Sequence, residues 1–106
     1  MKSRRQPSHM EDIVAVLKDS AKVERFSSAR EFLRRHLIHC RDILNGKDFL
    51  FSGPSGDIHE ALKTVVAIEH EASRFLQFDY VEIDDYFLLR VVGAADYQDV
   101  IGSYFD

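Results

Sequence analysis

The spacing of hydrophobic and polar positions divides the chain into helical and extended parts. Apolar residues recur every three to four positions in residues 10–21, again in residues 28–44, and once more in residues 57–75. From Leu76 onward the period changes to two residues, which is typical of strands. The pattern therefore predicts three helices, with most of the extended structure near the C-terminus.

Local signals refine the helix boundaries. Ser28 and Glu31 have the spacing of a capping box, which predicts that the second helix begins there, and Gly46 supplies its end. Asp57 is the expected cap of the third helix. The third helix is expected to bury a stripe formed by Ile58, Ala61, Leu62, Val65, Ile68, Ala72 and Phe75.

Three short segments have strand character. Residues 47–52 are aromatic and lie between two glycines, which indicates one strand. Residues 78–83 and 86–92 alternate in polarity on either side of Asp84-Asp85, which predicts an antiparallel hairpin with a two-residue turn. Residues 94–105 are expected to form a short final helix.

The predicted order is therefore α-α-β-α-β-β-α. It indicates an α+β fold with a small, three-stranded, mainly antiparallel sheet and helices packed on one face. The length of 106 residues suits one domain, over residues 10–106, after a flexible basic arm formed by residues 1–9. An alternative interpretation is that the stretch 7–10 is a cloning remnant and the native chain starts at Met10.

Composition places the chain among ordinary globular proteins, with 45% hydrophobic and 30% charged residues. Cys40 is the only cysteine, so the chain cannot form an intramolecular disulfide, which fits a reducing compartment. No apolar run approaches the length needed to span a bilayer. We therefore expect a cytoplasmic protein without a membrane segment, and no motif indicates a cofactor.

The charge is distributed unevenly. The net charge is −4, but residues 1–52 carry an excess of four positive charges and residues 53–106 an excess of eight negative ones. From Asp79 to the C-terminus, Arg90 is the only basic residue among seven acidic ones. Two halves of opposite net charge indicate either that they attract each other in the fold or that one of them binds a charged partner.

Tyrosines lie among the acidic residues of this C-terminal part. Tyrosine offers contact area and carboxylates steer a basic partner, so this combination favours a protein interface over a cation site. Asp84 and Asp85 are adjacent and lack a calcium-loop pattern, which also disfavours a cation site. The predicted partner-binding residues are Asp79, Tyr80, Glu82, Asp84, Asp85, Tyr86, Asp96, Tyr97 and Asp99.

Histidine and cysteine residues form the second candidate for chemistry. His36 and Cys40 would lie one turn apart on the second helix, close enough to share a metal. However, both fall on its apolar face, and Cys40 near a helix C-terminus is poorly placed for a reactive thiolate. A packed His36, a buried Cys40 and no metal site are the simpler interpretation for the set His36, His39, Cys40, His59 and His70.

Two weaker candidates concern anions. The loop at residues 53–56 precedes a helix, but it lacks the lysine of a phosphate-binding loop, and Asp57 would repel an anion there. Arginines on the second helix could contact phosphates, yet the acidic net charge and the lack of a nucleic-acid-binding motif disfavour such a partner. These arginines are Arg30, Arg34, Arg35 and Arg41.

The first hypothesis is therefore a small acidic interaction module, similar in behaviour to immunity, inhibitor or adaptor proteins, which binds a basic protein. No motif matches any such family, and we do not expect an enzyme. The alternatives are a homodimeric regulatory domain, joined through a sheet edge or the second helix, and a minor metal-binding or enzymatic domain that uses the histidines and Cys40.

Overall fold

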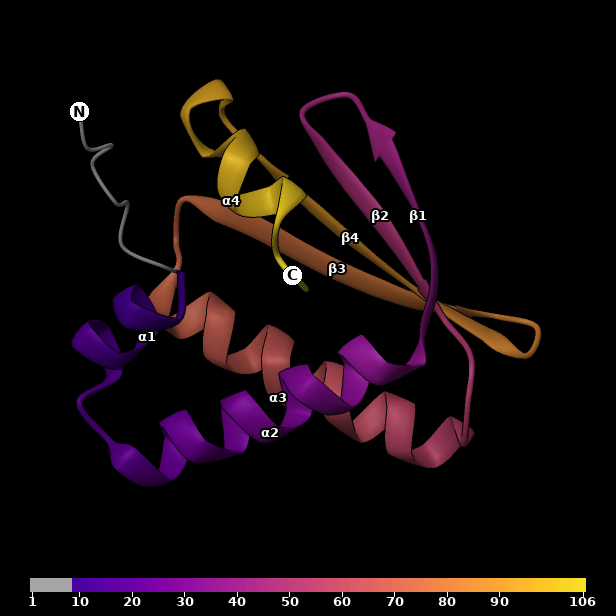
Figure 1. The fold of residues 1–106 in the computed structure, drawn as a ribbon, viewed down its shortest axis with the longest axis horizontal. Helices are drawn as coiled ribbons and strands as arrows, with labels where there is room; N and C mark the ends of the chain where they lie inside the picture. The colour runs from indigo at the N-terminus through magenta and orange to yellow at the C-terminus, as the bar shows by residue number, and fades with distance from the viewer. Residues whose placement is uncertain (1–8) are drawn as a thin grey trace, which may run out of the picture.

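A computed structural model describes residues 9–106 and shows an α+β fold with a four-stranded antiparallel sheet (Figure 1). The elements, in chain order, are α1 (His9–Leu17), α2 (Ser20–His36), β1 (Leu37–Ile43), β2 (Gly46–Phe51), α3 (Ser55–Ala72), β3 (Leu76–Ile83), β4 (Tyr86–Gly93), the 3₁₀ turn η1 (Ala95–Tyr97) and α4 (Gln98–Gly102). The predicted fold class is confirmed, while the predicted number of strands and the order of elements are not.

The additional strand is β1, in a segment that the sequence analysis assigned to the second helix. This assignment is wrong because the chain turns back at Leu44-Asn45 and pairs residues 37–43 with β2. Asn45 adopts a φ of 62°, and its carbonyl accepts a hydrogen bond from the Gly93 amide at 2.9 Å. Asparagine is one of the few residues that readily adopt this left-handed conformation, so Asn45 suits the second position of the turn. The apolar residues of 37–44 fit the spacing of a helix as well as that of a strand. The turn that follows them decides in favour of the strand.

The sheet order is β1-β2-β4-β3, so β1 and β3 are the two edges. All three pairings are antiparallel. The hairpin predicted around Asp84-Asp85 is confirmed: Ile83 pairs with Tyr86, and Asp84 adopts a φ of 54°.

The start of α2 also differs from the prediction. Asp19 caps it by accepting hydrogen bonds from the amides of Ala21 and Lys22, at 3.0 and 3.2 Å. The helix predicted for residues 10–21 therefore ends earlier, at Leu17, and the capping box predicted at Ser28 and Glu31 lies inside α2. A cap at Asp19 precedes an uninterrupted helical run to His36, so no second start is needed.

The other helices differ from the prediction at their ends. α3 begins at Ser55, before the expected cap at Asp57, and it ends at Ala72, so Phe75 lies outside it. The final helical segment is split into η1 and the short α4. Gly102 is the last residue of α4.

The core lies between one face of the sheet and the helices. α1, α2 and α3 form a layer along this face, and the chain after α4 returns to the same side (Figure 1). Phe105 contacts the rings of Phe49 and Phe51 edge-on, with distances of 5.0 and 5.4 Å between the ring centroids. Among the described residues no helix covers the opposite face of the sheet, which we call the open face.

One carboxylate lies inside this core. Glu69 on α3 is 0% exposed, and its Oε2 accepts hydrogen bonds from Tyr104 Oη and from His9 Nε2, the latter at 2.7 Å. The Arg30 guanidinium lies 5.1 Å from the centroid of the Tyr104 ring and donates to the Tyr104 carbonyl. The cluster therefore connects α1, α2, α3 and the C-terminal segment.

Burial, reinforced by the negative charge of Glu69, raises the pKa of Tyr104 well above its usual value. The phenol therefore stays protonated at neutral pH and acts as a hydrogen-bond donor. The sequence analysis missed this cluster. A signal for it exists, since Glu69 follows Val65 by four residues and Leu62 by seven, which places it on the buried stripe.

The first prediction concerns this buried hydrogen bond. Tyr104→Phe should lower the free energy of unfolding by about 1–3 kcal/mol, because the buried carboxylate loses a donor. The measurement is urea unfolding followed by circular dichroism. Tyr80→Phe is the matched control, since the half-buried Tyr80 hydroxyl has no hydrogen bond within the described residues. Equal stability of both variants would contradict a role for the Tyr104 hydroxyl.

The second prediction tests the close approach of β2 to β4 at Gly46. A Cβ atom added at Gly46 would lie 2.1 Å from the Val91 carbonyl oxygen, whereas one added at Gly56 has no atom within 4 Å. Gly46→Ala should therefore destabilise the fold by at least about 2 kcal/mol, since the sheet backbone must shift. Gly56→Ala in α3 should be neutral or stabilising by up to about 1 kcal/mol. Thermal melting of both variants measures the difference, and a mild Gly46→Ala variant would argue against this packing of β2 on β4.

Candidate functional site

The acidic residues predicted to bind a partner fall into two groups at opposite ends of β4. Asp84 and Asp85 form the turn before β4, while Asp96 and Asp99 follow its other end, in η1 and α4. A strand of this length spans roughly 26 Å. The nine residues therefore do not form one continuous patch.

The hairpin residues are also divided between the two faces of the sheet. Asp79 and Tyr86 point to the open face, whereas Tyr80 and Glu82 lie on the helix side, where Phe78 and Phe87 are buried. Tyr80 is half-buried, with its ring centroid 5.8 Å from that of His59. At the other end of the sheet, the Tyr97 ring stacks on that of Phe75, with 4.4 Å between the ring centroids. Tyr80 and Tyr97 are thus partly used within the fold.

The end of the β3–β4 hairpin is the most exposed of these places. Ile83 is 47% and Tyr86 42% exposed, although both are large and apolar. Asp84 and Asp85 form the turn between them, and Glu82 is next to Ile83 but on the other face of the sheet; none of these acids has an ion pair within residues 9–106. The hairpin also reaches past the end of β2, where the chain leaves the sheet for α3 (Figure 1). We call residues 82–86 the hairpin tip.

The open face carries a second group, which sequence reasoning did not find. Asp48 on β2 lies between Arg41 of β1 and Arg90 of β4, and its side chain is only 3% exposed. Arg90 donates two hydrogen bonds to it, at 2.8 and 2.9 Å, and Arg41 donates one at 3.0 Å. Asp79 lies opposite Arg90 on β3. The signal was hidden because β1 was predicted as helix, which removed Arg41 from the sheet.

The hydrogen bonds from Arg90, together with the bond from Arg41, hold the pKa of Asp48 below its usual value despite the burial of the carboxyl group. Asp48 is therefore ionised at neutral pH. Beside this group, His39, Leu50 and Leu88 border a small hollow on the open face.

The histidines and Cys40 do not converge. His36 is half-buried at the end of α2, where its Nδ1 lies 2.9 Å from the Phe32 carbonyl oxygen and its ring lies against that of Phe32, as expected for a packed histidine. The expectation for Cys40 is wrong, because β1 is an edge strand and leaves the thiol exposed. His59 and His70 are on α3, and no group of three potential metal ligands occurs within the described part of the chain.

The loop at residues 53–56 has a packing role. A Cβ atom at Gly53 would lie 2.5 Å from the His36 ring, so glycine lets the chain pass close to the end of α2. The Ser52 amide donates to the His36 carbonyl at 3.1 Å, which fixes the same approach. The phosphate-binding alternative gains no support from this arrangement.

The basic residues predicted to share one helix face are also separated. Arg30 is directed to the C-terminal segment, Arg34 pairs with Glu31 at 2.7 Å, and Arg41 belongs to the sheet. The pair with Glu31 is exposed and contributes little to stability. Arg35 remains as a largely exposed residue of α2.

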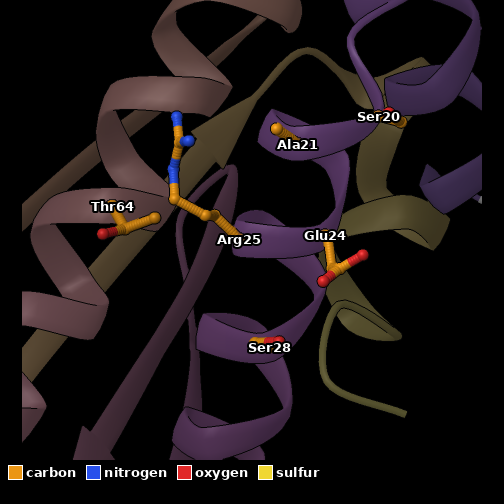
Figure 2. Close-up of a pocket in the computed structure, with 6 residues that line it drawn as sticks. All are labelled: Ser20, Ala21, Glu24, Arg25, Ser28 and Thr64. Carbon is orange, nitrogen blue, oxygen red and sulfur yellow. The ribbon is translucent and has the colours of Figure 1, made fainter.

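A polar groove lies between α2 and α3. Figure 2 shows Arg25 extending towards Thr64 on α3, whereas Glu24 points away from both. Its lining is completed by Ser20, Ala21 and Ser28. The acidic and basic side chains diverge, so the groove does not combine them on one bound group.

Searches against protein-family models, curated proteins and solved structures find no match to this chain. Within residues 9–106, no helix has both the length and the apolar character that crossing a membrane requires.

The third prediction concerns Asp48 and pH. A carboxylate whose pKa is lowered by folding stabilises the protein above its unfolded pKa, and this contribution is lost as the pH falls through the folded value. Asp48→Asn should therefore lower the free energy of unfolding at pH 7 by about 1–2 kcal/mol. The difference from the parent protein should persist to about pH 5 and shrink below about pH 4. Denaturant unfolding at each pH measures it, and a pH-independent difference would contradict the assignment.

Proposed function

We propose that this protein is a small interaction module that binds a basic protein partner through the hairpin tip. The observation that carries the proposal is the exposure of Ile83 and Tyr86 beside acids that have no ion pair within residues 9–106. Other acids of the fold are engaged, such as Asp48 with two arginines and Glu71 with Lys22. The negative charge of the tip is therefore available to a second molecule.

The composition of the tip suits this role. Burying Ile83 and the Tyr86 ring supplies the hydrophobic part of the binding energy, since each large apolar side chain contributes about 1.5–3 kcal/mol when fully buried. The acids around them accelerate encounter with a basic surface and disfavour acidic competitors. Immunity, inhibitor and adaptor proteins act by binding of this kind, without chemistry of their own.

The C-terminal helical residues have a smaller part in this proposal. Asp96, Tyr97 and Asp99 follow the far end of β4, so a partner that contacts them and the tip must span the length of the sheet. Tyr97 is also stacked on Phe75. The tip is therefore the primary contact, and Asp96 and Asp99 serve as a comparison in its test.

The fourth prediction is that Asp84→Lys with Asp85→Lys abolishes capture of the partner. The parent protein, immobilised in a lysate of its native host, should retain a basic protein that also binds after purification, in a fixed stoichiometry. Asp96→Lys with Asp99→Lys is the matched control, because it changes the net charge by the same amount at the opposite end. This control should retain the partner, and circular dichroism should confirm that both variants fold.

The outcomes separate the possibilities. Loss of binding in the tip variant alone supports the proposal. Loss in both variants would mean that net charge rather than the tip drives capture. Loss in the Asp96/Asp99 variant alone would place the contact at the other end, and equal capture by all three proteins, or no capture by the parent, would also contradict the proposal.

A further inference from the structure

The open face of the sheet carries a row of four charged residues, one from each strand. Arg41 pairs with Asp48, Asp48 with Arg90, and Arg90 with Asp79 in the register of the sheet. Because the strand order is β1-β2-β4-β3, the charges alternate in sign across the whole sheet. The row combines two residues from each half of the chain and is neutral in total.

An apolar row runs beside the charged one. Its apolar members are Leu50, Leu88 and Val81, and His39 occupies the same row on β1. Val81 is 50% exposed, and Leu50 and Leu88 are half-buried on a face that no helix of residues 9–106 covers. Exposed apolar area of this kind, bordered by charges, is typical of an interaction surface.

An alternating row with an even number of charges is complementary to its own reverse. Rotating a second copy about a two-fold axis parallel to the strands places its β3 over β1 and its β4 over β2. Arg41 then faces Asp79 of the second copy, and Asp48 faces Arg90 of the second copy. In the apolar row, Leu50 faces Leu88 of the second copy. A two-fold axis that runs across the strands, between the two sheets, would instead place each charged residue opposite the same residue of the second copy. Like charges would then face each other, which disfavours that arrangement.

We propose that two copies of this chain pack through their open faces, with strands aligned, as a symmetric dimer held in register by the charged row. Face-to-face packing of this kind is common for twisted antiparallel sheets. The apolar row supplies the attraction, while the charges chiefly determine the alignment of the two copies. Ile83 and Tyr86 of the hairpin tip point to the same face, at its end. The dimer is argued from the two rows alone and not from the acids of the tip, so the inference does not depend on the proposed function.

The size of the face sets the expected affinity. Four strands of about seven residues measure roughly 19 Å by 23 Å, so two such faces together bury on the order of 1,000 Å². This area is at the lower end for specific interfaces. We therefore expect a reversible dimer with a dissociation constant on the order of micromolar.

The fifth prediction uses the separation of Arg41 and Asp79. They lie on opposite edge strands, three strand spacings or roughly 14 Å apart, so they do not contact each other within one chain. In the dimer, however, each faces the other in the second copy. Arg41→Glu alone and Asp79→Lys alone should each weaken the dimer at least tenfold, because both variants bring like charges together. An equimolar mixture of the two variants should dimerise again, since every facing pair is then opposite in charge.

Sedimentation velocity of the full chain between about 1 and 200 µM measures these effects. The parent protein should approach twice its mass of 12.2 kDa as its concentration rises. Lys63→Glu on α3 is the control for charge and should leave the dimer unchanged. Asp84→Lys with Asp85→Lys should also leave it unchanged, which keeps failure of the tip proposal distinguishable from failure of the dimer.

Three results would overturn the inference. The first is a parent protein that stays monomeric throughout this concentration range. The second is a parent dimer whose Arg41→Glu and Asp79→Lys variants do not recombine in the mixture. The third is growth beyond the dimer, because pairing of β1 with β3 of the next copy along the sheet edges would form an open chain of molecules.

Discussion

The fold depends on a buried acidic side chain, Glu69, in the last turn of α3. An unpaired carboxylate in an apolar core costs several kcal/mol, and two donors to Oε2 of Glu69 offset part of this cost, while Oε1 has no partner within the described residues. The donors come from the two ends of the described chain, His9 at the start of α1 and Tyr104 after α4. Arg30 holds the Tyr104 backbone in addition. Both ends of the described chain must therefore reach Glu69 if α3 is to pack with this residue inside the core.

The same cluster explains why the sheet is covered on one side only. The C-terminal segment must return to the helix side to bring Tyr104 to Glu69, and on the way it packs Phe105 against Phe49 and Phe51. No described element remains to cover the other face. On the open face, ion pairs take the place of a packed layer. Asp48 of β2 pairs with Arg41 of β1 and Arg90 of β4 and so links the three strands. The features that could bind other molecules are therefore on the face and the end that the core does not use.

The sequence was informative where its pattern had one interpretation. Residues 76–92 are rich in aromatic and β-branched residues and are interrupted only at Asp84-Asp85, so the hairpin was predictable with its turn. Residues 37–44 have apolar positions that satisfy both a helix and a strand, and the preceding helix favoured the wrong choice. The local signal for a hairpin is Asn45, which tolerates the left-handed conformation of a turn. The strand that follows it is held by pairing with β4, which lies far along the chain.

The candidate site was predictable in part, for a similar reason. The tip acids adjoin one another in sequence, so their proximity is a local property. The separation of Asp84 from Asp96 follows from the straight course of β4 between them, which a charge count along the chain does not show. The Asp48 group and the Glu69 cluster join residues of distant segments, and neither has a motif that would reveal it.

The two proposed surfaces have a geometric relation that follows from the symmetry axis. A rotation about an axis parallel to the strands leaves the direction along each strand unchanged, so both hairpin tips of a dimer lie at the same end. A partner with two basic sites would then meet both tips at once, and the second contact would form at the effective concentration set by the first. Weak binding by one small tip would then be sufficient. The row of four charged residues has no net charge. It therefore permits this arrangement, because it does not add to the repulsion between the two acidic tips.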